Sequence, residues 1–256
     1  MTDYGLDGIK FYDANFFVNP SRAIKFAQGL IDNNLKIRWG ASAHLKGVVR
    51  LGDNLAKMKE SGLNRLLIGA ESGSQVALDY MNKGCTVEDN IRAAELCAKY
   101  DIPVSFTFIV GMPGVKDDLS PTLELALKMK KISGNFDVNI HFYAPFPGTP
   151  LFDESIKYGY QPPTNLQGWS SLDYYVIQTP WIDKKEEKKV RRFGDFYCDF
   201  LYPPTWFLED IRSRPILSQT YKVLRHIVEL PYKVHFYGLP VEMNWLKSIT
   251  GKKTFQ

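Results

Sequence analysis

The sequence predicts an α/β fold in which a parallel sheet is covered by helices. Short β-rich runs recur about thirty residues apart in the first part of the chain, which is the length of a strand plus its crossover helix. Apolar strands that alternate with helices form parallel sheets, and right-handed crossovers then close a barrel or leave an open, curved sheet. The predicted strands are residues 8–12, 36–43, 65–70, 103–111 and 137–144.

Helix-capping residues between these strands support the same fold. Asn19 stands directly before a proline and can cap the helix that this proline opens. Thr86 and Asp89 have the spacing of a capping box. Ser120, followed by another proline, begins a third helical pattern. The helices therefore alternate with the predicted strands as βα units require.

The composition excludes several classes of protein. The chain has 256 residues, 45% of them hydrophobic and 23% charged, which is ordinary for a folded domain. Lys and Arg number 32 against 28 Asp and Glu, an excess too small to predict a nucleic-acid partner. No apolar run approaches membrane-spanning length, and no basic segment leads into an apolar stretch at the start. The expected location is the cytoplasm, with peripheral membrane contact as a variant of it.

Cysteine and histidine usage predicts no metal site within the chain. Cys85, Cys97 and Cys198 lie too far apart to form a close-spaced ligand motif, and an odd count argues against a disulfide framework. The four histidines also lack metal-ligand spacing.

The chain divides into two regions in the sequence pattern. The strand and helix alternation fills residues 1–152, and residues 153–256 form a mainly helical appendage rich in aromatic residues. Its predicted helices are residues 184–202, 206–211 and 219–230. The aromatic side chains are expected to pack these helices over the core, or alternatively to contact an apolar substrate or a membrane surface.

Polar residues and glycines follow several of the predicted strands. The carboxyl ends of parallel strands meet at one rim, where the sites of such folds form. Carboxylate and amide groups there can bind ammonium and hydroxyl groups, and glycines let a flat ring lie against backbone. This set suits a polar, cationic, adenosine-like ligand, although each residue alone can also cap a turn or helix. The residues are Asp13, Asn15, Glu71, Ser72, Gly111, Pro113 and Gly114.

Four motifs in order resemble the radical S-adenosylmethionine (SAM) enzymes, especially the branch that often carries a cobalamin-binding domain. The resemblance covers residues 4–152, more than half of the chain. The motifs are "FYDANFFVNPSRAIKF", "GAESGSQVALDYMNKGCT", "FIVGMPG" and "YAPFPGTPLF".

The resemblance implies a fold, cofactors and a reaction. The fold is a partial barrel of six βα units, whose first loop holds a 4Fe-4S cluster with three cysteines in the pattern C-x-x-x-C-x-x-C. The cluster, reduced by an electron donor, cleaves SAM to a 5′-deoxyadenosyl radical that attacks a small-molecule substrate. In the cobalamin-linked branch, methyl transfer and radical cyclisation are common outcomes, which makes cobalamin a further expected cofactor.

The resemblance also carries site residues over to this sequence. Asp13 and Asn15 occupy the position that in the family lies near the amino group of SAM. Glu71 and Ser72 occupy the position near the ribose or the amino acid portion. These four residues are therefore expected to bind SAM.

Two loops complete the expected SAM site. Gly111 matches the backbone that lies along adenine, Pro113 belongs to the same loop, and Tyr143 begins the loop after the last strand. The sequence departs from the branch at Ala14, where a second acid is usual, and at residues 113–116, where Pro-Gly-Glu-Thr is common. These departures bear on the SAM contacts more than on the fold.

The largest departure concerns the cluster. No C-x-x-x-C-x-x-C occurs in the sequence, and its strand pattern begins at what would be the second strand of the barrel. The expectation is a fragment, the downstream part of a longer radical SAM enzyme that lacks the first βα unit and is inactive alone. The alternatives are a complete nucleoside-binding relic and a non-radical barrel lyase.

Overall fold

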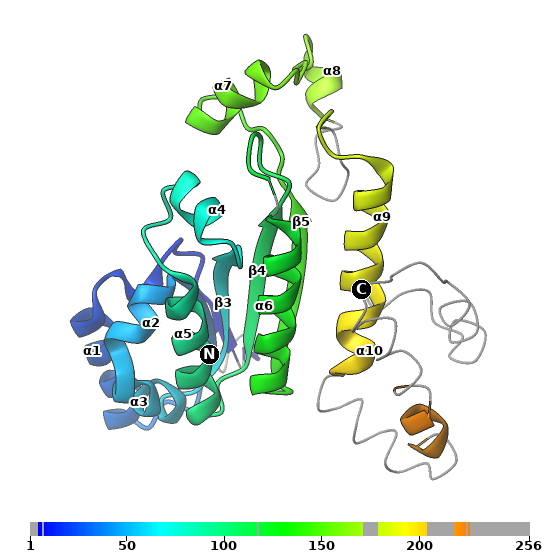
Figure 1. The fold of residues 1–256 in the computed structure, drawn as a ribbon. Coiled ribbons are helices and arrows are strands. Elements are labelled where there is room, and N and C mark those ends of the chain that lie inside the picture. Colours follow the sequence, from blue (N-terminus) through cyan, green and yellow to red (C-terminus); the bar gives the residue numbers. More distant parts are fainter. Residues whose placement is uncertain are drawn as a thin grey trace. The chain divides into compact units, whose positions relative to one another are not determined.

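A computed structural model of the chain forms two compact units (Figure 1). The first unit is Met1–Val110 with Val115–His141, and the second is Gly111–Gly114 with Phe142–Gln256. The division predicted at residue 152 stays a prediction. The structure describes residues 5, 6, 8–116, 118–170, 179–203, 218–223 and 225.

The first unit is built on a five-stranded sheet whose strands follow one another in chain order. The first four strands pair in parallel, as successive βα units require. The register shifts at Trp39/Gly40 and again at Gly69/Glu71, near the end of the third strand. The α/β class and the open, partial-barrel order are confirmed. The strands are β1 (Gly8–Lys10), β2 (Arg38–Ala43), β3 (Leu63–Glu71), β4 (Val104–Val110) and β5 (Phe136–Phe142).

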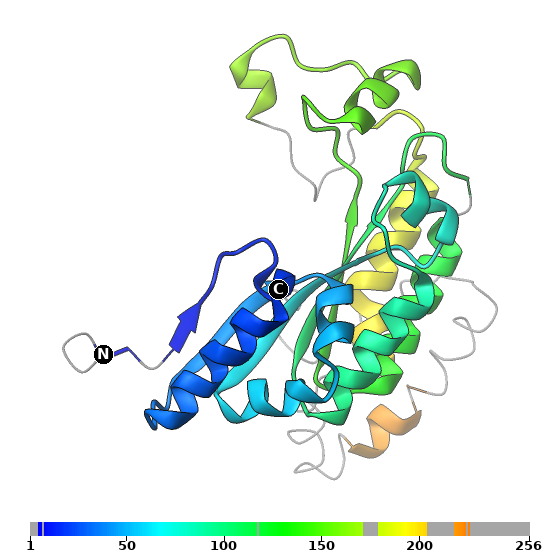
Figure 2. The ribbon, with the colours of Figure 1, turned by 90° about the vertical axis from the view of Figure 1, so that its left-hand side faces the viewer.

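Helices cover one face of this sheet (Figure 2). The predicted caps form: the Asn19 side chain accepts a hydrogen bond from the Arg22 N–H, and Thr86 with Asp89 makes a capping box. The sequence patterns missed α2 and α3, because helices of about two turns are too short to show a sustained apolar period. The elements are η2 (Phe16–Val18), α1 (Pro20–Asp32), α2 (Leu45–Leu51), η3 (Gly52–Asn54), α3 (Leu55–Glu60), α4 (Gln75–Tyr80), α5 (Val87–Lys99) and α6 (Leu119–Ile132).

The two faces of the sheet differ in burial. Along β4 every second residue is buried, and Phe106 in the middle of this row packs edge-to-face on Phe136 with the ring centroids 5.3 Å apart. Trp39 on β2 faces the same way, into a cluster with Phe11, Phe16 and Phe26. Side chains of the opposite face are intermediate or exposed, so the apolar core lies between the sheet and its helices.

The second unit is mainly helical in its described part, as the sequence predicted. The acidic N-cap of α9, Asp183, accepts hydrogen bonds from the N–H groups of Lys185 and Glu186. Among the described residues no helix is long and apolar enough to cross a membrane. The predicted helix at 206–211 and most of that at 219–230 lie outside the described residues. The elements are α7 (Pro150–Lys157), α8 (Leu166–Trp169), α9 (Lys184–Arg192), a π-helical segment (Phe193–Cys198) and α10 (Asp199–Leu201).

Candidate functional site

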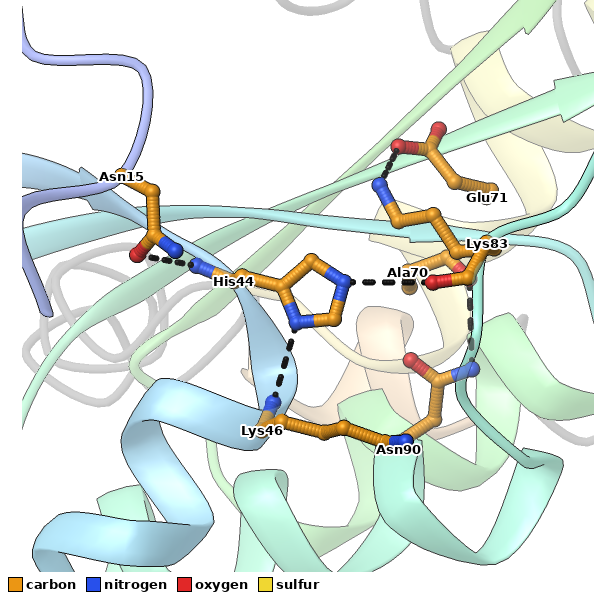
Figure 3. A network of polar contacts seen from close by, with 7 residues as sticks. All are labelled: Asn15, His44, Lys46, Ala70, Glu71, Lys83 and Asn90. Atoms are coloured by element: carbon orange, nitrogen blue, oxygen red, sulfur yellow. Dashed lines mark hydrogen bonds and ion pairs between the residues drawn. The ribbon is translucent and has the colours of Figure 1, made fainter. Parts of the chain in front are cut away.

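The carboxyl ends of β2 and β3 and the loop after β1 are joined by a polar network (Figure 3). Asn15 Oδ1 accepts the backbone N–H of His44 at 3.2 Å, so this amide fixes the residue that directly follows β2. His44 Nδ1 accepts the Lys46 N–H at 3.2 Å and thereby caps α2. The other ring nitrogen, which then carries the proton, donates to the Lys83 carbonyl at 3.4 Å. The network therefore reaches Lys83, which stands beside Glu71.

Glu71 and Lys83 form an ion pair at the end of β3. Lys83 Nζ lies 2.6 Å from Glu71 Oε1, and the side chains are only 24% and 15% exposed. Glu71 has a φ of 62°, a left-handed conformation that is uncommon for a residue other than glycine. This conformation, together with the register shift in the β3–β4 pairing, turns the carboxylate back over Gly69. Backbone strain of this kind is frequent at binding sites.

Gly69 makes room for this ion pair. A Cβ at this position would overlap Glu71 Oε1 and lie 3.2 Å from Lys83 Nζ. The backbone beneath the pair is held by Asn90 of α5, whose Nδ2 donates to the Ala70 carbonyl at 3.2 Å. Asn90 is fully buried, and its Oδ1 accepts no hydrogen bond among the described residues. The site is thus supported from the core side of the sheet.

Ser72 is placed differently from Glu71. It is fully buried, its Oγ lies 3.0 Å from Thr122 Oγ1, and it also accepts the Ser74 N–H at 3.0 Å. Thr122 in turn donates to the Asp118 carbonyl at 2.6 Å. These bonds tie the start of α4 to α6, so the hydroxyl of Ser72 serves the fold. Its contact with SAM stays a prediction.

Asp13 lies outside the network. Its carboxylate is 3.3 Å from Arg22 of α1, and both side chains are about half exposed. An exposed pair of this kind contributes about 0–1 kcal/mol, so it leaves Asp13 able to exchange partners. Of the four residues predicted in this unit, the network therefore includes Asn15 and Glu71, while Asp13 and Ser72 bond elsewhere.

Four residues predicted for the site belong to the second unit, three of them in one turn. Gly111 and Gly114 bound a turn with φ values of 78° and 74°. Trp181 Nε1 donates to the Gly111 carbonyl at 3.0 Å, and a Cβ on Gly111 would overlap Ile182. Tyr158 packs on Gly114 in the same manner. Aromatic residues of the appendage thus cover this turn, to which Pro113 also belongs.

Tyr143 is held inside the second unit. It is 9% exposed, and its hydroxyl accepts a hydrogen bond of 3.2 Å from Ser155 Oγ on α7. Burial raises the pKa of Tyr143, and the bond from Ser155 opposes this rise. Its phenol therefore stays neutral at physiological pH and fixes the loop after β5 to α7.

Sequence reasoning missed two members of the site. His44 follows the second strand directly, so the rule that sites form at strand ends could have found it. Lys83 lies twelve residues after Glu71, beyond α4, and no local pattern predicts that this short helix returns the chain to the ion pair. Its position inside the motif "GAESGSQVALDYMNKGCT" was the available signal.

The lowered pKa values of two histidines in the first unit predict how the stability of this unit depends on pH. Burial lowers the pKa of His44 below 6.5, with a further lowering from the charge of Lys83, and burial also lowers the pKa of His141. The unfolded chain then binds these protons more readily, so stability that is present above about pH 6.5 is lost as the pH falls through the folded pKa values. Protonation of His44 would also remove the hydrogen bond that Nδ1 accepts from the Lys46 N–H, which caps α2.

We expect urea denaturation to give a free energy of unfolding that falls between about pH 7.5 and about pH 5. The variant His44→Asn keeps a capping side chain but removes the titration, so its pH slope should be shallower than that of the wild type. His141→Gln should independently reduce the slope of the free energy of unfolding against pH. Identical slopes in the wild type and the double variant would contradict this account.

The described residues do not form a site for an iron–sulfur cluster. None of their His, Cys, Asp and Glu side chains form a group of three or more that could hold a metal ion. The three cysteines are buried, and burial raises the pKa of Cys97 to about 12, which opposes the thiolate that a cluster needs. A 4Fe-4S cluster therefore does not fit the part of the chain that the structure describes.

Comparison with known proteins links the chain to a family. Residues 3–126 match the model of the radical SAM superfamily. Over this region, just under half of its length, the chain is similar to the radical SAM superfamily. This agrees with the motifs in the sequence and with the parallel sheet, whose strands β1 to β4 fall within the matched region.

The curated relatives of this chain are longer than the region they share with it. An uncharacterized methyltransferase, PH0819 of Pyrococcus horikoshii, is 26% identical over 211 residues, which are 82% of this chain and 44% of the relative. The anaerobic magnesium-protoporphyrin IX monomethyl ester cyclase of Rubrivivax gelatinosus is 29% identical over 154 residues, 57% of this chain and 27% of the relative. The chain thus spans less than half the length of either protein.

A solved structure shares the fold of this chain. The cobalamin-dependent SAM radical enzyme OxsB superposes with a TM-score of 0.56 at 18% identity, covering 87% of this chain and 39% of that chain. This likeness concerns the fold alone.

Proposed function

We propose that this chain is the SAM-binding part of a radical SAM enzyme. The observation that carries the proposal is the Glu71–Lys83 pair at the end of β3. The amino acid portion of SAM bears an ammonium and a carboxylate. The Glu71 carboxylate can bind the ammonium, and the Lys83 ammonium can bind the carboxylate. A carboxylate has about four lone-pair positions and an ammonium has three donors, so both keep capacity beyond their mutual bond. The donor set therefore fits the amino acid portion of the cofactor.

The other predicted residues differ in how directly they would contact SAM in this proposal. Asn15 positions His44 beside the pair, and Asp13 supplies a second carboxylate once it leaves Arg22. Ser72 would act through the loop that it fixes rather than by direct contact. In the second unit, the turn of Gly111 and Pro113 is the proposed support for adenine, with Tyr143 holding the neighbouring loop.

The cluster would be held by residues that this chain does not contain. Such a cluster would supply the electron that cleaves SAM, and an electron donor would be a necessary partner. The residues of this chain bind and orient the cofactor and its substrate. Cytoplasmic location and peripheral membrane contact stay expectations from the sequence.

The reaction of the whole enzyme is proposed from its relatives. One relative is named as a methyltransferase, and another is named as an anaerobic magnesium-protoporphyrin IX monomethyl ester cyclase. These names support methyl transfer or cyclisation, and the fold shared with the cobalamin-dependent enzyme OxsB supports cobalamin as a further cofactor. The second candidate is a nucleoside-binding protein without radical chemistry, which the absence of a metal-holding group among the described residues favours. A barrel lyase is less supported, since the lysine at the site is paired with Glu71.

Calorimetric titration of SAM tests the proposal with a pair of glycine variants. Gly69→Ala places a methyl group where the Glu71 carboxylate lies, so it should displace the ion pair and weaken SAM binding about tenfold, the loss of about 1.4 kcal/mol. Gly29→Ala, in α1 where nothing lies within 4 Å, should leave binding unchanged and stabilise the helix by about 0.5–1 kcal/mol. Equal SAM affinity in both variants would contradict the proposed site.

A further inference from the structure

The open face of the sheet carries a row of basic residues. In the parallel pairing, Lys10 lies beside Gly40 and Gly40 lies beside Arg65, so the three share one row across β1, β2 and β3. Paired residues of a sheet project to the same face, and these project away from the buried rows. Two cations therefore flank a glycine on the face that is opposite the helices.

A cavity of about 520 Å³ lies over this row. Arg38 adds a third cation to its wall, and Ser42 and Ser105 contribute hydroxyl groups from the row above. Gly40 keeps the space between Lys10 and Arg65 open, because any side chain there would begin 3.2 Å from the Arg65 carbonyl and fill it. The cavity thus combines basic and hydroxyl groups with apolar walls, and it has room for a group of several heavy atoms.

The described lining of the cavity is rich in basic residues. Its described lining contains three cations, and no Asp or Glu is among these residues. Arg65 pairs with Asp137 of β5, but the pair is about half exposed and its strength is modest. Lys10 stands over the ring of Tyr12 at 4.9 Å. Like charges that line one cavity repel each other, and an anion between them relieves that repulsion.

We propose that this cavity binds a carboxylate or phosphate group of the substrate. Arg65 supplies a planar fork of donors that matches either group, Lys10 supplies a point charge from the opposite side, and Ser42 adds a hydroxyl donor. Taking the anion as part of the substrate rests on the proposed function. The anion site itself rests on the row and the cavity.

The site also sets a length for the substrate. Arg65 and Glu71 lie six residues apart on β3, which corresponds to about 20 Å at about 3.3 Å per residue. Leu67 and Gly69 project to the same face between them and offer an apolar and a flat surface. The proposed substrate therefore carries its anionic group at one end of an extended, partly apolar body.

Titration calorimetry at low ionic strength tests the anion site with inorganic pyrophosphate and with succinate as probes. At least one probe should bind, and Lys10→Gln and Arg65→Gln should each weaken its binding tenfold or more. Lys25→Gln on the exposed side of α1 removes the same charge elsewhere and should change the affinity less than twofold. Binding of pyrophosphate alone indicates a phosphate ligand, and binding of succinate alone indicates a carboxylate.

Two results would overturn the inference. One is that neither probe binds the wild-type chain, and the other is that Lys25→Gln weakens binding as much as the variants of the row. Arg65→Gln breaks the ion pair with Asp137 and could destabilise the fold. Lys10→Gln breaks no such pair, so it still tests the anion site if the Arg65 variant does not fold. SAM titrated into the same preparations separates the two proposals: anion binding without SAM binding would retain the site and reject the proposed function.

Discussion

Replacing Glu71 by glutamine is expected to weaken SAM binding by about tenfold to a hundredfold. A hydrogen bond to a charged group contributes about 1.5–3 kcal/mol, and the amide keeps the shape of the side chain while it removes the charge. The same change leaves Lys83 without its anionic partner at a site where both side chains are mostly buried. Calorimetric titration of SAM into the wild type and the variant measures this loss.

A control variant and a double-mutant cycle test the role of Glu71 in SAM binding. Glu124→Gln removes an exposed carboxylate from α6 and should leave SAM affinity unchanged. Lys83→Met should weaken binding by a similar factor to Glu71→Gln, and the double variant should lose less than the sum, because the two residues act on one ligand portion. An unchanged dissociation constant for Glu71→Gln would reject the site.

Truncating Phe106 to alanine is expected to cost about 3–5 kcal/mol of the free energy of unfolding. Phe106 is fully buried in the middle of β4 and packs edge-to-face on Phe136. Its removal leaves a cavity between the sheet and its helices, which neighbouring side chains fill only in part. Because domains have about 5–15 kcal/mol of net stability, the variant should unfold at much lower urea concentration.

Leu67→Ala is the control for this prediction. Leu67 lies on β3 with 40% of its surface exposed, on the face that bears the basic row. We expect it to cost less than about 1 kcal/mol, since little apolar area is uncovered by its truncation. Equal losses for Phe106→Ala and Leu67→Ala would contradict a sheet that is packed on one face only.

The strands and the longer helices could be predicted because their signals are local. The five β-rich runs, the Asn19 cap and the capping box of Thr86 each depend on neighbouring residues. The family could be predicted because its motifs are contiguous. Such signals need no knowledge of which distant segments meet.

The pairing within the site could not be predicted, because it depends on how distant segments meet. Lys83 reaches Glu71 only through the turn of α4, and Ser72 bonds to Thr122 fifty residues away. The left-handed conformation of Glu71 follows from the register shift beside it, which no residue pattern announces. The basic row likewise appears only once the register places Lys10 and Arg65 on either side of Gly40.

Equilibrium dialysis of radiolabelled SAM tests the central claim most directly. The wild-type chain, Lys83→Met and the control Lys25→Met are dialysed side by side under anaerobic conditions. The account predicts that the wild type and Lys25→Met retain one SAM per chain, and that Lys83→Met retains much less at the same free concentration. Retention of SAM by none of the three, or by all three equally, would contradict a SAM site built on Glu71 and Lys83.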